Sequence, residues 1–238
     1  MIGNKGEEDS VMKQRIGFIF ADEMEFQPFS EIALSDGGQF LSKRPMNTIR
    51  YEVGDTEIIA VECGIGKVNA GLAASLLILD HQVDAVLNAG LSGAIQHLRK
   101  GDVVAGSSYV ECDFDLTAFG YPVGQKSDGT RFHTAAADLL ETACSIDGVR
   151  AARLGTGDFF LADPVKKQEY KEAFDIEAFD METAAIAAVC DRLETPFLSI
   201  RKISDDAGDA ATESYREVNE LAEKALSEVL LELVRKLC

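Results

Sequence analysis

The 238-residue sequence is poor in the side chains that nucleophilic hydrolases and many metal sites use. It has only three histidines, His81, His97 and His133, and they lie far apart along the chain. A Ser–His or Cys–His nucleophile arrangement therefore has little support. The five cysteines are scattered, odd in number and without a CxxC pair, so neither a zinc site nor a disulfide framework is indicated. Reduced thiols in the cytoplasm are the simplest interpretation.

Other absences argue against membrane and nucleic-acid partners. No apolar run reaches the ~20 residues that a membrane span needs. The first 14 residues are polar, mixed in charge and lack the apolar core of a signal peptide, so we expect a flexible N-terminal tail and no secretion. The 41 acidic residues outnumber the 23 basic ones and give a net charge of −18, which repels phosphate backbones and anionic lipids. The same charge also favours solubility.

What the sequence does contain is an alternation of short apolar runs with helix-like stretches. The strand-like runs are residues 16–20, 57–61, 85–89, 149–154 and 196–203, with a strand pair or bend at 103–110. The helix-like stretches are residues 68–79, 133–144, 181–193 and 218–237. This alternation predicts an α/β fold, with one domain over residues 15–238 and a central, largely mixed or parallel twisted sheet flanked by helices.

Ligands of such sheets bind beyond the carboxyl ends of the strands. Four polar or glycine-rich segments follow predicted strands, at residues 21–25, 64–67, 90–94 and 204–209. The second of them, GIGK, lacks the glycine spacing of a phosphate loop, and Val68 stands where a magnesium-binding Ser or Thr is needed. It predicts a tight strand-to-helix turn, which argues against nucleoside triphosphates.

Carboxylates stand at several of these strand ends. Glu23 and Glu25 begin a helix, where favourable interaction with the helix dipole is the ordinary explanation and a catalytic base is the sharper one. At Asp205, helix capping competes with a general acid of raised pKa. The segment Asp180-Met181-Glu182 opens another helix directly after a strand, where a carboxylate can accept two sugar hydroxyls. Several carboxylates without a basic phosphate cradle together suggest a neutral, polyhydroxylated ligand.

Five segments carry a resemblance that covers nearly the full chain. They are IGFIFADEMEF (16–26), ECGIGKVNA (62–70), DLTAFGY (115–121), TGDFFL (156–161) with FDMETAAIA (179–187), and RKISDDA (201–207). On these segments the sequence resembles the 5′-methylthioadenosine/S-adenosylhomocysteine nucleosidases of the nucleoside phosphorylase superfamily. The resemblance implies a nucleoside phosphorylase-like fold. It also implies hydrolysis of an N-glycosidic bond to adenine and a thioribose, with no cofactor and no metal.

The resemblance also implies roles for individual residues. Glu25 corresponds to the general base that activates water. Asp205 corresponds to the general acid that protonates adenine N7, with Ser204 beside it as an orienting group. Met181 and Glu182 correspond to the pair that binds the ribose, in which the glutamate accepts the 2′- and 3′-hydroxyls.

Further positions correspond to the walls of the family's pocket. Phe160 resembles the aromatic residue that stacks on adenine, and Leu161 the residue whose backbone reads the purine edge. Gly93 corresponds to a glycine that lines the base and ribose site. The segment around Phe119 reaches a neighbouring subunit's 5′-alkylthio pocket in the family, which implies a homodimer. Tyr215 falls where the family usually has a phenylalanine that covers this pocket.

The chain departs from the family pattern at three places. Residues 90–93 are Gly-Leu-Ser-Gly where the family commonly has Gly-Ser-Ala-Gly, so Leu91 lacks the hydroxyl that helps hold water or contact phosphate. Asp180 replaces a frequent glutamate and is expected to alter sugar contacts, and Lys202 is an unusual charge in its strand. Three alternatives stay open: a purine nucleoside phosphorylase, a nucleosidase for 5′-deoxyadenosine or a futalosine-like nucleoside, and a nucleoside-binding protein without turnover.

Overall fold

The structure is a computed structural model that describes residues 13–208, 211–212 and 220–237. One sheet contains the ten strands β1 (Gln14–Phe20), β2 (Gln39–Ser42), β3 (Asn47–Val53), β4 (Thr56–Glu62), β5 (Ala85–Ala94), β6 (Val103–Glu111), β7 (His133–Thr134), β8 (Val149–Thr156), β9 (Ala178–Asp180) and β10 (Phe197–Asp205). The helices are α1 (Glu23–Ser35), α2 (Lys67–Leu79), α3 (Ala137–Cys144), α4 (Pro164–Phe174), α5 (Thr183–Arg192) and α7 (Glu220–Leu237), with a 3-10 turn η1 (Thr117–Phe119).

The sheet is mixed and partly closed. The strand order is β10-β6-β8-β9-β5-β1-β4-β3-β2, and β10 also pairs with β5, so five strands close into a ring from which the other strands of this path extend. The neighbours β10, β5, β1 and β4 pair in parallel, so their carboxyl ends meet at one edge. The predicted α/β fold with a mixed sheet flanked by helices is confirmed.

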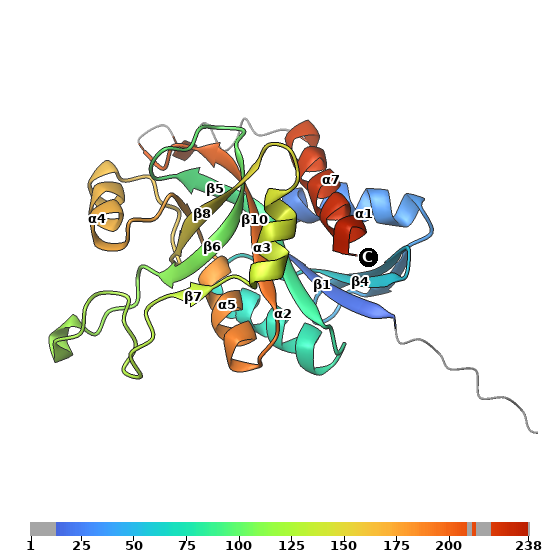
Figure 1. Ribbon diagram of the computed structural model, residues 1–238, viewed down its shortest axis with the longest axis horizontal. Coiled ribbons are helices and arrows are strands. Elements are labelled where there is room, and N and C mark those ends of the chain that lie inside the picture. The colour runs from blue at the N-terminus through green and yellow to red at the C-terminus, as the bar shows by residue number, and fades with distance from the viewer. Residues whose placement is uncertain (1–12, 209–210, 213–219, 238) are drawn as a thin grey trace, which may run out of the picture.

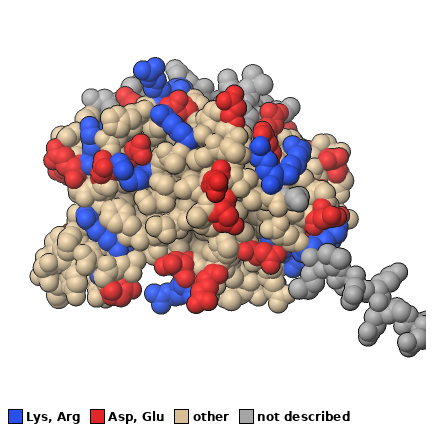
Figure 2. All heavy atoms as spheres, in the orientation of Figure 1, with Lys and Arg blue, Asp and Glu red and all other residues tan. Residues whose placement is uncertain are grey.

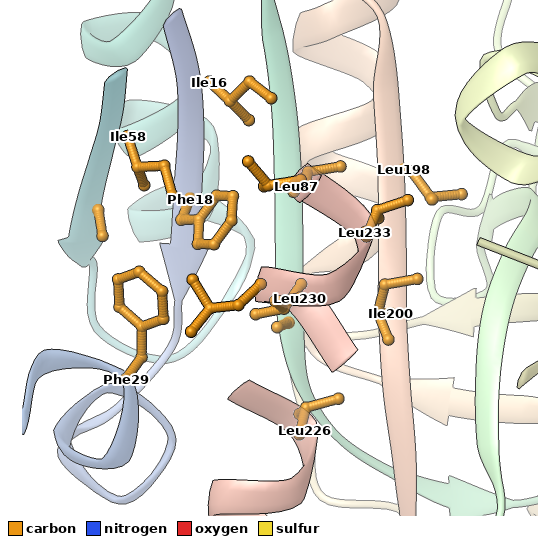
Figure 3. Packing of buried hydrophobic residues seen from close by; sticks show 14 of the residues in the cluster. Ile16, Phe18, Phe29, Ile58, Leu87, Leu198, Ile200, Leu226, Leu230 and Leu233 are labelled. Carbon is orange, nitrogen blue, oxygen red and sulfur yellow. The ribbon is translucent and has the colours of Figure 1, made fainter. Parts of the chain in front are cut away.

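Helices cover both faces of the sheet (Figure 1). On one face, α1, α3 and α7 enclose a cluster of buried apolar residues. Figure 3 shows Phe18, Leu87 and Ile200 of the strands together with Phe29 of α1 and Leu230 of α7, and each of these side chains is at most 1% exposed. On the other face, alanine-rich α2 and α5 pack against each other and against the sheet. Within α7, Leu226, Leu230 and Leu233 lie in this core at the three- and four-residue spacing of an amphipathic helix.

Some predicted elements differ from the structure. Residues 103–110 belong to one strand, β6, and not to a strand pair or bend. The predicted helix over 133–144 begins at Ala137, because β7 occupies His133 and Thr134. Residues 90–94 and 204–205 lie in β5 and β10 and not beyond them. Their glycine and polar side chains are typical of loops, but long-range pairing between β5 and β10 keeps them in the sheet.

The segment between β6 and β7 extends away from the body of the molecule (Figure 1). It carries η1, where Phe119 is 78% exposed. Elsewhere on the face drawn in Figure 2, acidic side chains are spread widely with basic ones among them. None of the described helices is long and apolar enough to cross a bilayer.

Candidate active site

A cavity of about 340 Å³ opens at the edge where the carboxyl ends of β1, β5 and β10 meet. Eight of the residues predicted for the site line it, namely Glu25, Gly93, Phe160, Leu161, Met181, Glu182, Ser204 and Asp205. Phe119 does not line this cavity, and Tyr215 lies outside the described residues. The full lining comes from six parts of the chain, residues 21–25, 65, 91–93, 159–161, 179–182 and 204–207.

Glu25 is held at the floor of the cavity by the start of α1. Asp22 caps this helix, because its side chain accepts a hydrogen bond from the Glu25 amide at 3.0 Å. The Glu25 carboxylate turns back into the protein and accepts the amides of Ala21 (2.9 Å) and Leu91 (2.8 Å). Burial raises the pKa of Glu25 to about 8, against the opposing effect of the nearby Arg201 guanidinium. A buried carboxylate of raised pKa has the basicity that a general base needs.

Asp205 ends β10 on the opposite side of the cavity. Its Oδ2 accepts the Ser204 hydroxyl at 2.7 Å and its Oδ1 accepts the Ala207 amide at 2.8 Å. Burial raises the pKa of Asp205 although both hydrogen bonds favour the ionised form. A raised pKa favours the protonated acid, and Ser204 fixes the direction in which the carboxyl group points.

Glu182 stands at the N-terminus of α5 and is 4% exposed. Its Oε1 accepts the Gly66 amide at 3.0 Å, so the predicted tight turn of the GIGK segment directly positions a site residue. Met181 precedes it on the cavity wall. Burial raises the pKa of Glu182, while Arg201 nearby acts to lower it. The carboxylate has acceptor capacity left for sugar hydroxyls.

Asp180, which is expected to alter the sugar contacts, forms hydrogen bonds with neighbouring groups of the protein. Its Oδ1 accepts the Thr156 hydroxyl (2.8 Å) and the amides of Glu182 (3.0 Å) and Thr183 (2.9 Å). Although Asp180 borders the cavity, these contacts make it a support for the start of α5. The shorter side chain of aspartate at position 180 is therefore expected to affect the position of Glu182. Lys202 is not among the residues that line the cavity.

Arg201 is a site component that the sequence reasoning missed. It is 0% exposed, and its Nη2 donates to Asn88 Oδ1 and Thr183 Oγ1 at 2.6 Å each. Its Nε lies 3.3 Å from Asp180 Oδ2, and its Nη2 lies 3.6 Å from Glu182 Oε2. The feature of the sequence that could have indicated it is an arginine inside an apolar strand, because a buried charge requires partners of opposite sign. Arg201 thus pairs with Asp180 and Glu182 from behind the cavity wall.

Two glycines permit this close approach. A Cβ atom at Gly90 would collide with the Glu25 carboxylate and lie 2.5 Å from Arg201 Nη1. A Cβ atom at Gly93 would lie 2.8 Å from Asp205 Oδ1. Leu91 between them contributes its amide to Glu25, while the buried Ser92 hydroxyl finds no hydrogen-bond partner among the described residues. Leu91 lacks the hydroxyl that is common at its position in the family. The Ser92 hydroxyl does not take its place by contacting Glu25.

Aromatic side chains form the remaining wall. Phe160 is 43% exposed and Leu161 is buried, and both border the cavity. Phe159 also borders it, and its ring packs against Phe179 with centroids 5.3 Å apart. A flat, apolar wall beside a buried acid suits a heteroaromatic base. No group of three or more potential metal-ligating side chains is found in the described part of the chain.

Comparison with known proteins shows the family of this chain. The family model for the phosphorylase superfamily matches residues 15–235. The chain belongs to the phosphorylase superfamily. Within this superfamily it is 36% identical over 194 residues to a 5′-methylthioadenosine/S-adenosylhomocysteine nucleosidase of Bacillus subtilis, a match that covers 78% of this chain and 84% of the relative.

Solved structures of the superfamily share the whole fold. A mutant of the Helicobacter pylori 5′-methylthioadenosine/S-adenosylhomocysteine nucleosidase, crystallised with 5′-methylthioadenosine in its active site, superposes with a TM-score of 0.90 and 26% identity. That match covers 94% of this chain and 99% of the other. A futalosine hydrolase of the same organism gives a TM-score of 0.88 with 26% identity, covering 94% and 98%. The superfamily's fold is therefore compatible with more than one nucleoside substrate.

Proposed function

We propose that this phosphorylase-superfamily protein hydrolyses the N-glycosidic bond of 5′-methylthioadenosine and S-adenosylhomocysteine, releasing adenine and a thioribose. The observation that carries the proposal is the pair of buried carboxylates Glu25 and Asp205 at one cavity, both with a raised pKa. The relatives named for this activity, at up to 37% identity, support the choice of substrate.

In the proposed mechanism, Asp205 donates its proton to the purine and Glu25 accepts a proton from the attacking water. Protonation makes the purine a better leaving group, and the sugar acquires oxocarbenium character as the bond breaks. Water then adds to the anomeric carbon from the opposite face, as in inverting glycosidases. General acid and general base steps each contribute typically ~10²–10⁴-fold. In their ionised forms, the carboxylates of Glu25 and Glu182 stabilise the positive charge that develops on the sugar.

Phosphorolysis fits the cavity less well than hydrolysis. Among the described residues that line it there are five carboxylates and no lysine, arginine or histidine. The guanidinium of Arg201 lies behind the wall at 0% exposure and is paired with carboxylates. Leu91 offers no side-chain hydroxyl for a phosphate oxygen. Water is accordingly the proposed nucleophile.

Adenine release from 5′-methylthioadenosine is expected to proceed at the same rate in phosphate-free buffer and in buffer with phosphate. The measurement is chromatographic quantification of adenine and of the sugar product. A strict phosphate requirement, with a sugar 1-phosphate as product, would overturn the hydrolytic proposal in favour of a phosphorylase. Tight binding without any product would identify a binding protein instead. Parallel reactions with 5′-deoxyadenosine and futalosine test the related nucleosidase activities.

We also propose that the chain acts as a homodimer whose partner supplies Phe119 to the 5′ end of the cavity. Support comes from apolar side chains that are exposed at the GIGK turn and on α2, namely Ile65 (52%), Val68 (83%) and Leu72 (48%). Exposed apolar side chains that gather on one surface are typical of interfaces.

Val68→Asp is therefore expected to convert a dimer to a monomer in sedimentation analysis and to raise KM for 5′-methylthioadenosine. Leu34→Asp is the matched control, because Leu34 is exposed on α1, which covers the opposite face of the sheet from α2. If the wild-type protein sediments as a monomer at the concentrations used in the activity assay, the dimer proposal is contradicted. The hydrolytic proposal is unaffected by that result.

A further inference from the structure

Lys67, the first residue of α2, takes part in a closed ring of hydrogen bonds beside the aromatic wall of the cavity. Its amide donates to Asp158 Oδ1 at 2.8 Å, and the Asp158 amide donates to Asp113 Oδ2 at 2.9 Å. Asp113 Oδ1 accepts the Lys67 ammonium group at 2.7 Å, which closes the ring. Because Phe159 and Phe160 follow Asp158 directly and border the cavity, the ring holds the residue from which the aromatic wall begins.

The turn that carries Lys67 also holds the carboxylate proposed to bind the ribose. The Gly66 amide donates to Glu182 Oε1 at 3.0 Å, and the Lys67 amide is the next one along the chain. Because Gly66, the N-cap residue of α2, has no side chain, carboxylates from two distant segments bind the first amides of this helix. A Cβ atom at Gly66 would lie 3.1 Å from Asp158 Oδ1. Two adjacent amides therefore set the spacing between Glu182 and Asp158.

The ring depends on the positive charge of Lys67. Its ammonium group also binds Glu111 Oε2 at 3.0 Å. The side chains of Lys67, Glu111 and Asp113 are only 17%, 13% and 23% exposed, so water screens their charges weakly. Without the ammonium group, Glu111 and Asp113 would be neighbouring like charges, and their repulsion would turn Asp113 away from the ring. The Asp158 amide would then lose its acceptor.

We propose that Lys67 is a positioning residue, which fixes the aromatic wall relative to Glu182 and so sets the affinity for the purine. The inference rests on the proposed function, in which the purine stacks on this wall. Glu25 and Asp205 are held by hydrogen bonds of their own, outside the ring. Glu182 keeps its pairing with Arg201. Loss of the Lys67 charge should therefore weaken binding of the base and leave the sugar site and the chemical step in place.

The test measures the dissociation constants of adenine and of 5-methylthioribose by isothermal titration calorimetry. Lys67→Met removes the charge and keeps an unbranched side chain. It is expected to raise the Kd of adenine about tenfold, because the ring of the base no longer meets a fixed aromatic face. The Kd of 5-methylthioribose is expected to stay unchanged. With 5′-methylthioadenosine, KM should rise by a similar factor while kcat stays within about threefold of the wild type. Lys67→Arg keeps the charge and is expected to restore most of the affinity for adenine.

Lys126→Met is the matched control, because Lys126 pairs with the same Glu111 from the segment between β6 and β7 and is not a member of the ring. Its Kd for adenine is expected to equal that of the wild type. Asp158→Ala provides a second variant at an exposed position, where the fold is expected to tolerate the change, and it should raise the Kd of adenine like Lys67→Met.

Equal losses of affinity for adenine and for 5-methylthioribose in Lys67→Met would indicate a general structural role and overturn the inference. An unchanged Kd of adenine in Lys67→Met, or in Asp158→Ala if Lys67→Met does not fold, also overturns it. Both results leave the proposed function standing. Failure of the wild type to bind adenine and to release it from 5′-methylthioadenosine overturns the proposed function itself.

Discussion

Asp205→Asn is expected to lower kcat/KM for 5′-methylthioadenosine by at least ~10²-fold, and by up to ~10⁴-fold. The amide cannot donate the proton that the purine needs to leave, yet it preserves the size of the side chain. Its oxygen can still accept one of the two hydrogen bonds that Ser204 and the Ala207 amide now donate. The loss should therefore appear mainly in kcat, with the far-ultraviolet circular dichroism spectrum unchanged.

Asp206→Asn is the matched control for this result. Asp206 is the next residue along the chain, is exposed, and accepts the Gly208 amide at 3.1 Å, which Asn can also do. The control is expected to retain wild-type kcat/KM. If Asp205→Asn kept more than a tenth of the wild-type activity, Asp205 would not be the general acid.

Glu25→Gln is expected to produce two effects of opposite sign, lower activity and higher stability in alkaline buffer. Activity should fall by at least ~10²-fold, because glutamine cannot accept a proton from water. Stability should rise because burial holds the pKa of Glu25 at about 8 in the folded protein, above its ordinary value of 4.5. Folding therefore favours the protonated side chain and disfavours the ionised one.

The sign of the pH dependence follows from this raised pKa. The contribution of Glu25 to the free energy of unfolding is fully present below about pH 4.5 and is lost as pH rises to about 8. Glutamine is neutral throughout, so Glu25→Gln should match the wild type near pH 5 and exceed it by roughly 3–5 kcal/mol above pH 8. Urea denaturation at the two pH values measures this difference. Glu23→Gln, which removes an exposed carboxylate, is expected to change neither activity nor stability at either pH.

The sequence was sufficient to predict the α/β class and most core strands, because apolar runs such as 16–20 and 57–61 are short and bounded by polar residues. Eight of the residues that the family resemblance names for the site line one cavity, although their roles stay predictions. The sequence was not sufficient for the closure of the sheet into a ring. That closure depends on pairing between β5 and β10, which are about a hundred residues apart. The spacing of apolar residues within each strand does not indicate which distant strand it pairs with.

Arg201 and Asp180 show a second limit of sequence reasoning. An arginine in an apolar strand indicates a buried partner, but the identity of that partner depends on how β10 and α5 pack. Only the fold brings Arg201 to Asp180 and Glu182 and places Gly90 where a side chain would separate Arg201 from Glu25. Gly90 was predicted to lie in a segment that follows a strand. It lies inside β5 instead, where it leaves space between two charged groups.

The assignment of acid and base is tested most directly by the rates of the two variants on a substrate whose leaving group needs no proton. A 4-nitrophenyl 5-methylthioriboside loses 4-nitrophenolate, which is stable as an anion, and adenine release from 5′-methylthioadenosine is the reference reaction. Expressed as a fraction of the wild-type rate in phosphate-free buffer, Asp205→Asn should recover most of its activity on the nitrophenyl substrate. Glu25→Gln should remain at least ~10²-fold slow on both substrates. Equal losses on both substrates for Asp205→Asn, or recovery by Glu25→Gln, would contradict the proposed acid–base pair.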